Sequence, residues 1–313
     1  MNILPLNLSL MVSITMIISS TSWFHMWLSL EINLVCFIGT VLYSNMFHEA
    51  MIKYFLTQAM GSSLFIMGYM TSPIFMDLHM ITAAALMIKL GLVPFHFWYP
   101  EVMNMLSWHH CLILSTLQKF GPLTLLFNLN MNLIMFGILS TIVSSLMSIN
   151  QSSLRKLLSF SSISHNGWML VAISYQSTLW WVYFFIYSII NILIMIALMN
   201  LNWYHINQIE FTNTPFMITW LIGILALGGL PPTVGFVPKW LILSITSFHS
   251  YLITMILIFS SLIILFAYLM MLYKPLIMMH NQQKLNFNNS KDNSSNWSWI
   301  LLLTLPTIPL SFS

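Results

Sequence analysis

Four ionisable side chains lie deep inside long apolar stretches of the sequence, where a charge is costly. They are Glu31, Lys89, Lys119 and Lys239. If these stretches cross a membrane, each central charge costs about 2.5–3.5 kcal/mol, and four cost on the order of 10 kcal/mol, comparable with the stability of a whole domain. We therefore expect these side chains to face one another, water or backbone carbonyls.

Buried lysines are suited to proton transfer. Desolvation lowers the pKa of a lysine, so it can bind and release a proton near neutral pH, whereas arginine stays charged. Two charges about 6 Å apart interact by roughly 3 kcal/mol, or about two pKa units, at an effective dielectric near 20. Glu31 beside Lys89 would therefore control the protonation of that lysine. The alternative is a structural ion pair between Glu31 and one lysine, which leaves two lysines unpaired.

Two histidines are weaker candidates for the same chemistry. His96 follows Lys89 by seven residues, or two helical turns, which predicts that both lie on one helix face. His165 lies in SSISHNGW among polar neighbours. Either imidazole could relay a proton. A histidine that only packs and satisfies its hydrogen bonds is the alternative for each.

The composition indicates that lipid, and not water, is the main solvent of this chain. Of its 313 residues 58% are hydrophobic and 5% are charged, whereas soluble domains carry about 25% charged residues. A spanning helix needs about 20 apolar residues, and such runs fill nearly the whole sequence. The runs do not alternate, which favours helices over a barrel. We predict an all-α membrane protein with a single membrane domain, 1–313.

The apolar runs predict eleven transmembrane helices. They are 3–20, 23–44, 48–70, 78–103, 108–129, 131–149, 158–174, 178–200, 215–245, 250–274 and 297–313. The first ten divide into two sets of five helices, 1–130 and 131–274. A polar loop, 275–296, and a C-terminal helix, 297–313, follow.

Glycine and proline interrupt the fourth helix of each set. The two segments read MIKLGLVPFHFWYPEV and LALGGLPPTVGFVPKW, and proline breaks a helix because it removes a backbone donor. An odd-numbered repeat inserts in the opposite orientation when it is duplicated, and paired broken helices are typical of transport sites built from inverted repeats. Lys89 and Lys239 lie at these breaks, where freed carbonyls can hold an ammonium group. Gly121 and Pro122 create a third weak point just after Lys119.

Basic residues predict how the chain is oriented. With eleven spans, Arg155, Lys156, Lys284 and Lys291 fall in loops on the same side as the N-terminus, and Lys274 ends its span there. The positive-inside rule places that side in the cytoplasm-equivalent compartment. The C-terminus then lies on the opposite side.

Several functions are excluded by what the sequence lacks. The net charge of +3 is scattered and forms no basic stripe for nucleic acid. Cys36 and Cys111 are isolated, so they cannot supply the four ligands of a zinc or iron–sulfur site. The sequence has no dinucleotide fingerprint, no P-loop and no histidine pair with haem spacing. We therefore expect no cofactor or metal in this chain.

Four ordered motifs resemble a known family. MIKLGLVPFHFWYPEV, LSTLQKFGPL, QSSLRKLLSFSSISHNGWM and LGGLPPTVGFVPKW together are similar to the chain 2 family of NADH–ubiquinone oxidoreductase, in its animal mitochondrial form. The resemblance runs from about Glu31 to Tyr273. It implies an antiporter-like, proton-translocating subunit of the membrane arm of respiratory complex I, in the mitochondrial inner membrane. The N-terminus would then face the matrix and the C-terminus the intermembrane space.

The resemblance also implies roles and partners. The family's central glutamate falls on Glu31, its two broken-helix lysines on Lys89 and Lys239, and its bridging lysine on Lys119. The enzyme is NADH:ubiquinone reductase, but NADH, FMN, iron–sulfur clusters and ubiquinone are bound by other subunits. The partners implied are other membrane-arm subunits and lipids, in a hetero-oligomer.

The resemblance is not complete, and two other functions stay open. Related bacterial antiporters have fourteen spans, so three N-terminal spans would be missing here. The related chain 4 usually has glutamate at the position of Lys239, which favours chain 2. One alternative is a scaffold subunit whose buried charges serve assembly only. The other is a subunit of a freestanding cation/proton antiporter.

Overall fold

The computed structural model describes residues 4–43, 48–71, 79–209 and 215–283, and these fold into α-helices joined by short connections. The helices of the first half are α1 (Leu4–Ser19), α2 (Trp23–Tyr43), α3 (His48–Thr71), α4 (His79–Leu90), α5 (Trp98–Met105), α6 (Trp108–Ser115) and α7 (Leu117–Asn128). Those of the second half are α8 (Ile134–Ser148), α9 (Leu154–Ser174), α10 (Leu179–Leu201), α11 (Pro215–Gly228), α12 (Phe236–His249) and α13 (Tyr251–Gln283). The prediction of an all-α protein is confirmed for the described residues.

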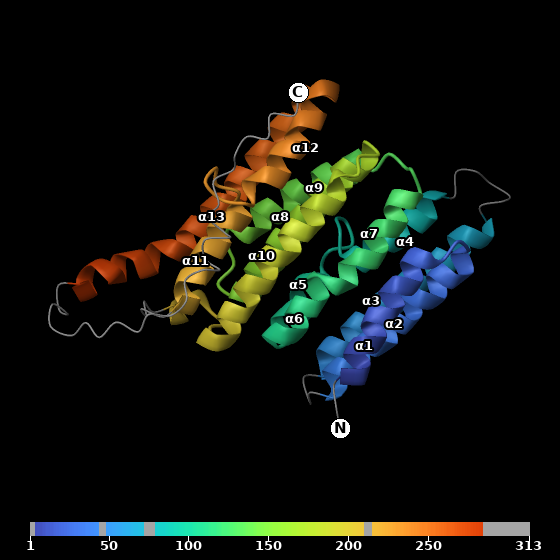
Figure 1. The fold of residues 1–313 in the computed structure, drawn as a ribbon, viewed down its shortest axis with the longest axis horizontal. Coiled ribbons are helices and arrows are strands. Elements are labelled where there is room, and N and C mark those ends of the chain that lie inside the picture. The colour runs from blue at the N-terminus through green and yellow to red at the C-terminus, as the bar shows by residue number, and fades with distance from the viewer. Residues whose placement is uncertain (1–3, 44–47, 72–78, 210–214, 284–313) are drawn as a thin grey trace.

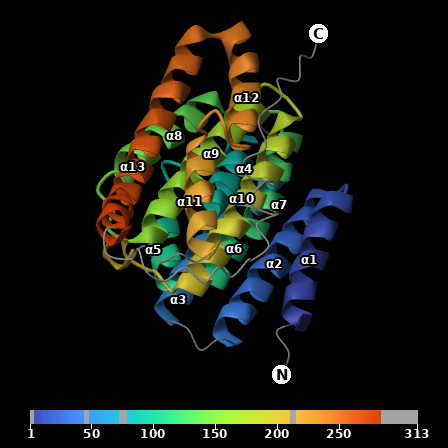
Figure 2. The same cartoon turned by 60° about the vertical axis from the view of Figure 1, so that its left-hand side comes forward.

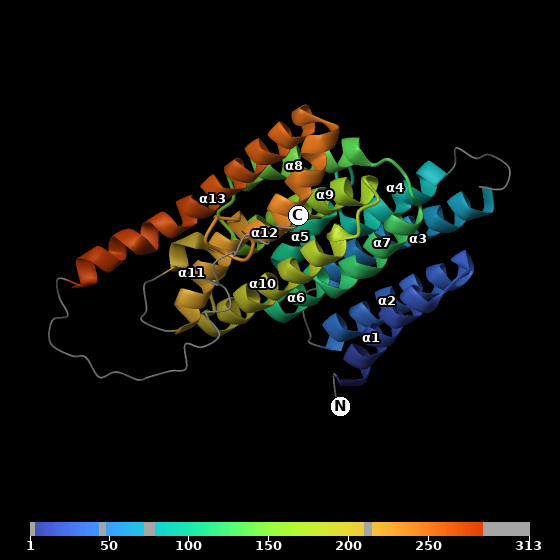
Figure 3. The same ribbon diagram turned by 45° about the horizontal axis from the view of Figure 1, so that its top comes forward.

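The helices lie side by side in one bundle. The α1–α2 hairpin forms one flank, and α12 and α13 form the opposite flank (Figures 1 and 2). The long helix α13 runs along the outer edge (Figure 3). Large apolar side chains on α1 and α13, such as Leu8, Phe259 and Met270, are exposed, as expected for helices that face lipid or a neighbouring subunit.

Helix α9 lies at the centre of the bundle. Nearly all of its side chains are buried, including polar ones such as Ser161, His165 and Asn166. A helix that is buried all round contacts protein on every side. The polar groups of α9 therefore face other helices and not lipid. They form a line of buried polar side chains inside the bundle.

Both predicted helix breaks are present. The first separates α4 from α5, and the second separates α11 from α12. A further break, at Thr116, divides the predicted span 108–129 into α6 and α7. The Thr116 hydroxyl donates to the carbonyl of Leu112 at 2.7 Å. The predicted weak point at Pro122 instead lies within α7.

The described helices differ from the predicted spans in one further respect. Helix α13 continues to Gln283, beyond the point at 275 where we expected the polar loop to begin. The predicted C-terminal helix, 297–313, lies outside the described residues. Three helices in the described part of the chain are long and apolar enough to cross a membrane on their own, namely Trp23–Tyr43, Leu179–Leu201 and Tyr251–Tyr273. The count of eleven spans therefore stays a prediction.

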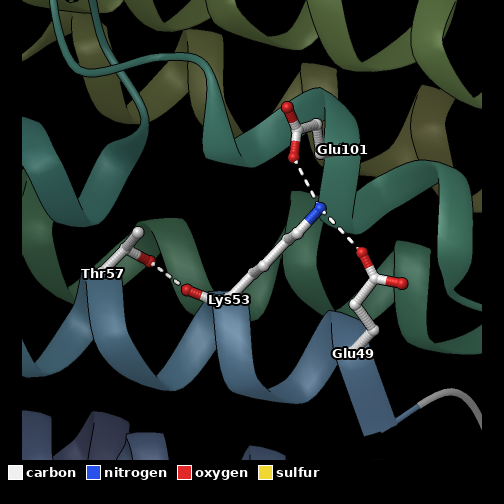
Figure 4. Close-up of polar contacts among 4 residues, drawn as sticks. All are labelled: Glu49, Lys53, Thr57 and Glu101. Carbon is white, nitrogen blue, oxygen red and sulfur yellow. Dashed lines mark hydrogen bonds and ion pairs between the residues drawn. The ribbon is translucent and has the colours of Figure 1, made fainter.

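Polar contacts link residues of α3 and α9 to α5 at one end of the bundle. Lys53 contacts Glu49 at 3.0 Å and Glu101 of α5 at 2.9 Å (Figure 4). At the end of the same helix α5, Arg155 donates to the carbonyl of Asn104 at 2.6 Å. Basic residues near the starts of α3 and α9 therefore lie at the same end, as the alternation of spans predicts.

Candidate functional site

The first broken helix ends in a Schellman motif. Gly91 has a φ of +67°, a left-handed conformation that suits glycine. Its N–H donates to the carbonyl of Ile88 at 3.1 Å, and the N–H of Leu92 donates to the carbonyl of Met87 at 3.0 Å. This pair of hydrogen bonds stops the helix without leaving those carbonyls unsatisfied. Lys89 is thereby fixed in the last turn of α4.

The second broken helix ends in the same way. Gly229 has a φ of +75°. Its N–H donates to the carbonyl of Ala226 at 3.0 Å, and the N–H of Leu230 donates to the carbonyl of Leu225 at 3.4 Å. The two breaks therefore share a backbone motif as well as a position in the predicted repeats.

At the second break, freed carbonyls hold a lysine. The ammonium group of Lys239, in the first turn of α12, donates to the carbonyls of Leu227 at 3.1 Å and Gly228 at 2.9 Å. Lys239 is only 7% exposed. The C-terminal end of a helix carries partial negative charge and favours a cation. The expectation that a break would hold an ammonium group is met at Lys239.

At the first break, side-chain amides and an indole bind the freed carbonyls. Gln58 donates to the carbonyl of Lys89 at 3.2 Å, and Asn166 of α9 to that of Leu90 at 3.4 Å. The indole of Trp98 donates to the carbonyl of Ile88 at 3.0 Å. The lysine ammonium group is therefore not needed to cap this helix.

Glu31 and Lys89 interact at a distance. Lys89 is 7% exposed and Glu31 of α2 is half-buried. Glu31 is close enough to act electrostatically on Lys89 and on Tyr54. Among the described residues, however, no carboxylate lies within 4.0 Å of the Lys89 ammonium group. The pair is thus coupled through space and is not a direct salt bridge.

Lys119 lies in the middle of the bundle, between the two broken helices. It is 2% exposed. Its ammonium group donates to the carbonyl of Ser162 in α9 at 3.3 Å and to the hydroxyl of Tyr187 in α10 at 3.4 Å. It also lies 5.0 Å from the ring centroid of Tyr99 and 5.4 Å from that of Tyr187. Carbonyl, hydroxyl and aromatic faces together replace a counter-ion.

His165 lies near both Lys119 and Lys239. Both lysines act on it electrostatically. Its Nδ1 contacts the Tyr183 hydroxyl at 2.7 Å, whereas its Nε2 has no hydrogen-bond partner among the described residues. A buried nitrogen without a partner is costly unless water or a proton reaches it.

His96 does not occupy the position that we predicted for it. Helix α4 ends at Leu90, so His96 lies in the non-helical connection to α5. The expectation that it shares a helix face with Lys89 is wrong, because the chain turns at Gly91. His96 is buried against Phe97, with ring centroids 4.2 Å apart, and neither of its ring nitrogens has a partner among the described residues.

Sequence reasoning missed the uncharged polar groups that surround the charges. Tyr54 donates to Gln118 at 3.1 Å, and Gln118 donates to Asn33 of α2 at 3.0 Å. Tyr183 and Tyr187, four residues apart on α10, were not singled out either. Their helical spacing within a strongly apolar span was the available signal. No group of His, Cys, Asp and Glu residues suited to a metal ion occurs in the described part of the chain.

Comparisons with known proteins agree with this architecture. Residues 70–266 match the family model described as NADH:quinone oxidoreductase/Mrp antiporter, TM. A chain of respiratory complex I from Thermus thermophilus has the same fold, with a TM-score of 0.76 at 20% identity over 87% of this chain and 69% of that one. A chain of the Mrp complex from Dietzia sp. has a TM-score of 0.77 at 15% identity, over 85% and 59%.

The fold and the matched family model define a membrane subunit of the antiporter-like class. Within that class, the chain is 40% identical to NADH-ubiquinone oxidoreductase chain 2 of Anopheles gambiae, over 72% of its own length and 71% of the relative. It therefore belongs to the NADH-ubiquinone oxidoreductase chain 2 family.

Proposed function

We propose that this antiporter-like, proton-translocating subunit of respiratory complex I moves protons along a buried row of side chains. The row begins at Glu31 and continues through Lys89 and Lys119 to Lys239, with His165 near the last two. Protons would reach it through a half-channel from one side of the membrane and leave on the other side. Because His96 lies outside α4, in the connection to α5, it would be at most an accessory to the row.

The observation that carries the proposal is that three buried lysines have no carboxylate partner within the described part of the chain. Two of them, Lys119 and Lys239, instead contact neutral groups that tolerate both the charged and the neutral form. These are backbone carbonyls at both lysines and, at Lys119, a hydroxyl and two ring faces. A structural ion needs a fixed counter-charge, because a buried unpaired charge costs several kcal/mol. A site that accepts both forms is what proton transfer requires.

Glu31 would control the first lysine. The two groups interact without a salt bridge, so a change of charge on one alters the proton affinity of the other without first breaking a contact. At an effective dielectric near 20, such an interaction is worth a few kcal/mol at short range. Glu31 would thus pass a coupling signal between Lys89 and a neighbouring subunit.

The wider arrangement follows from family membership. We propose that the chain works in the mitochondrial inner membrane, inside a hetero-oligomer of complex I subunits and lipids. NADH, FMN, iron–sulfur clusters and ubiquinone would be bound by other subunits. The two halves, with their similar broken helices, would form inverted five-helix repeats. The N-terminus would face the matrix, and the C-terminus the intermembrane space.

The deciding experiment replaces Lys119 within the intact complex. Lys119→Arg keeps a positive charge but cannot release a proton, and Lys119→Met removes the charge. If the row moves protons, both variants assemble, as judged by native gel electrophoresis, and NADH-driven proton pumping falls by at least roughly tenfold. Lys53→Met, which alters an exposed lysine of α3, is the matched control and should pump normally.

Two outcomes would reject the proposal. Pumping at the wild-type level in both Lys119 variants would show that no proton passes there. If Lys119→Met fails to assemble while Lys119→Arg assembles and pumps normally, the lysine serves assembly only, as the scaffold alternative requires. A freestanding antiporter is tested separately, because it would purify without flavin and iron–sulfur subunits.

A further inference from the structure

A small cavity is lined by residues that contact Lys119 and Lys239. His165 of α9, Tyr183 and Tyr187 of α10, and Ala226, Leu227 and Pro238 of the second break are among its lining residues. Its volume of about 10 Å³ is near the minimum that one water molecule needs, and such a water also needs two to four polar partners. Three lining residues, His165, Tyr183 and Tyr187, carry polar groups of the kind that such a water needs.

Tyr187 connects Lys119 to this cavity. Its hydroxyl oxygen accepts a hydrogen bond from the Lys119 ammonium group at 3.4 Å, and the same side chain lines the cavity. Its ring centroid lies 4.9 Å from that of His165. Because the hydroxyl accepts from the lysine, its own hydrogen stays available for a second acceptor.

Lys239 is linked to the cavity through Leu227. Leu227 lines the cavity, and its carbonyl accepts a hydrogen bond from the Lys239 ammonium group at 3.1 Å. His165 also lines it and has an unpaired Nε2 among the described residues. The cavity is therefore bounded by groups from both lysine sites and by a buried nitrogen that lacks a partner.

We propose that Tyr187 is a catalytic residue that relays protons from Lys119 to His165 through one water molecule bound in this cavity. This inference rests on the proposed function. The lysine N–H bond breaks as the hydroxyl oxygen takes that proton, and the original hydroxyl proton passes to the water. The water in turn passes a proton to Nε2 of His165. The products are a neutral lysine, an unchanged tyrosine and water, and an imidazolium ion.

Tyr183 has a different role, as a positioning residue. Its hydroxyl lies 2.7 Å from Nδ1 of His165. When Nδ1–H donates to that hydroxyl, Nε2 carries the lone pair that can accept a proton. Tyr183 thus selects the tautomer, whereas Tyr187 touches the transferred proton.

The relay is tested by Tyr187→Phe in the intact complex. This change keeps the ring that lies over Lys119 and removes only the hydroxyl. We expect the complex to assemble, proton pumping and coupled turnover to fall by roughly tenfold or more, and the solvent deuterium isotope effect on turnover to rise. Tyr251→Phe, at an exposed position of α13, is the matched control and should change neither quantity.

The outcomes separate the relay from the proposed function. Normal pumping and an unchanged isotope effect in Tyr187→Phe, with pumping lost in Lys119→Met, would overturn the relay and leave the lysine row standing. Normal pumping in both would overturn the row as well. Should Tyr187→Phe fail to assemble, Tyr187→His decides: restored pumping by a side chain that exchanges protons supports the relay, and assembly without pumping overturns it.

Discussion

Replacing Gly229 by alanine is expected to disable the Lys239 site. Gly229 has a φ of +75°, and a Cβ added there would lie 2.9 Å from Cδ and 3.0 Å from Nζ of Lys239. The left-handed conformation costs a residue with a side chain about 1–2 kcal/mol. The new methyl group would also push the lysine away from its two carbonyls, and a hydrogen bond to a charged group is worth about 1.5–3 kcal/mol.

Together these terms disfavour the native arrangement by on the order of 3 kcal/mol or more. That corresponds to a population change of more than about 100-fold. The neighbouring position provides the control, because a Cβ on Gly228 would meet Leu265 and Tyr268 at 3.6 Å, an ordinary van der Waals distance. Gly228→Ala adds the same methyl group without touching Lys239.

The assay is NADH-driven proton pumping by the purified complex in vesicles, together with its thermal stability. We expect Gly229→Ala to lose pumping by at least roughly tenfold, and Gly228→Ala to stay near wild type. Equal pumping in the two variants would refute the claim that the carbonyls at this break hold Lys239 in its working position.

Three further changes test other parts of the structure. Arg155→Ala removes a guanidinium group 4.3 Å from the Tyr204 ring centroid and should lower the melting temperature of the complex, since a cation–π contact contributes about 0.5–2 kcal/mol; an unchanged melting curve would contradict this. Asn166→Leu leaves the Leu90 carbonyl without its side-chain donor, so stability measured in the same way should fall by about 1–3 kcal/mol. His165→Gln keeps a polar group but cannot take up a proton at neutral pH, so the complex should assemble and pump poorly in the vesicle assay.

The buried charges and the helix breaks of this site could be predicted from the sequence, because both are unusual in an apolar helix. A lysine or glutamate inside an apolar run is conspicuous, and so is a cluster of glycine and proline. Lys239 and the two helix breaks were found in this way. The sequence predicted that freed carbonyls would hold a lysine at a break, but it did not identify those carbonyls. Their identity depends on where α11 ends and how α12 packs beside it.

The uncharged partners could not be predicted for a physical reason. Nothing in the sequence distinguishes Tyr187, Gln118 and Asn166 from other helical residues. Each acquires its role only in the folded protein, where it hydrogen-bonds to a residue of another helix. His96 shows the opposite failure. Its spacing from Lys89 would place both on one face of a continuous helix, but α4 ends at Leu90, one residue after Lys89. Periodicity therefore predicts faces reliably only where no break intervenes.

The two broken helices are alike in backbone and unlike in what binds their carbonyls, and this difference assigns them different tasks. At α11 the carbonyls of Leu227 and Gly228 hold the Lys239 ammonium group, so that group cannot move without giving up two hydrogen bonds. At α4 side-chain amides bind the corresponding carbonyls, and Glu31 acts electrostatically on Lys89. A row that is responsive at one end and anchored at the other can receive a signal at Lys89 and still hold a proton at Lys239. In the proposed row the two breaks would therefore supply two sites with similar backbones, of which Lys89 would respond to Glu31 and Lys239 would hold its proton.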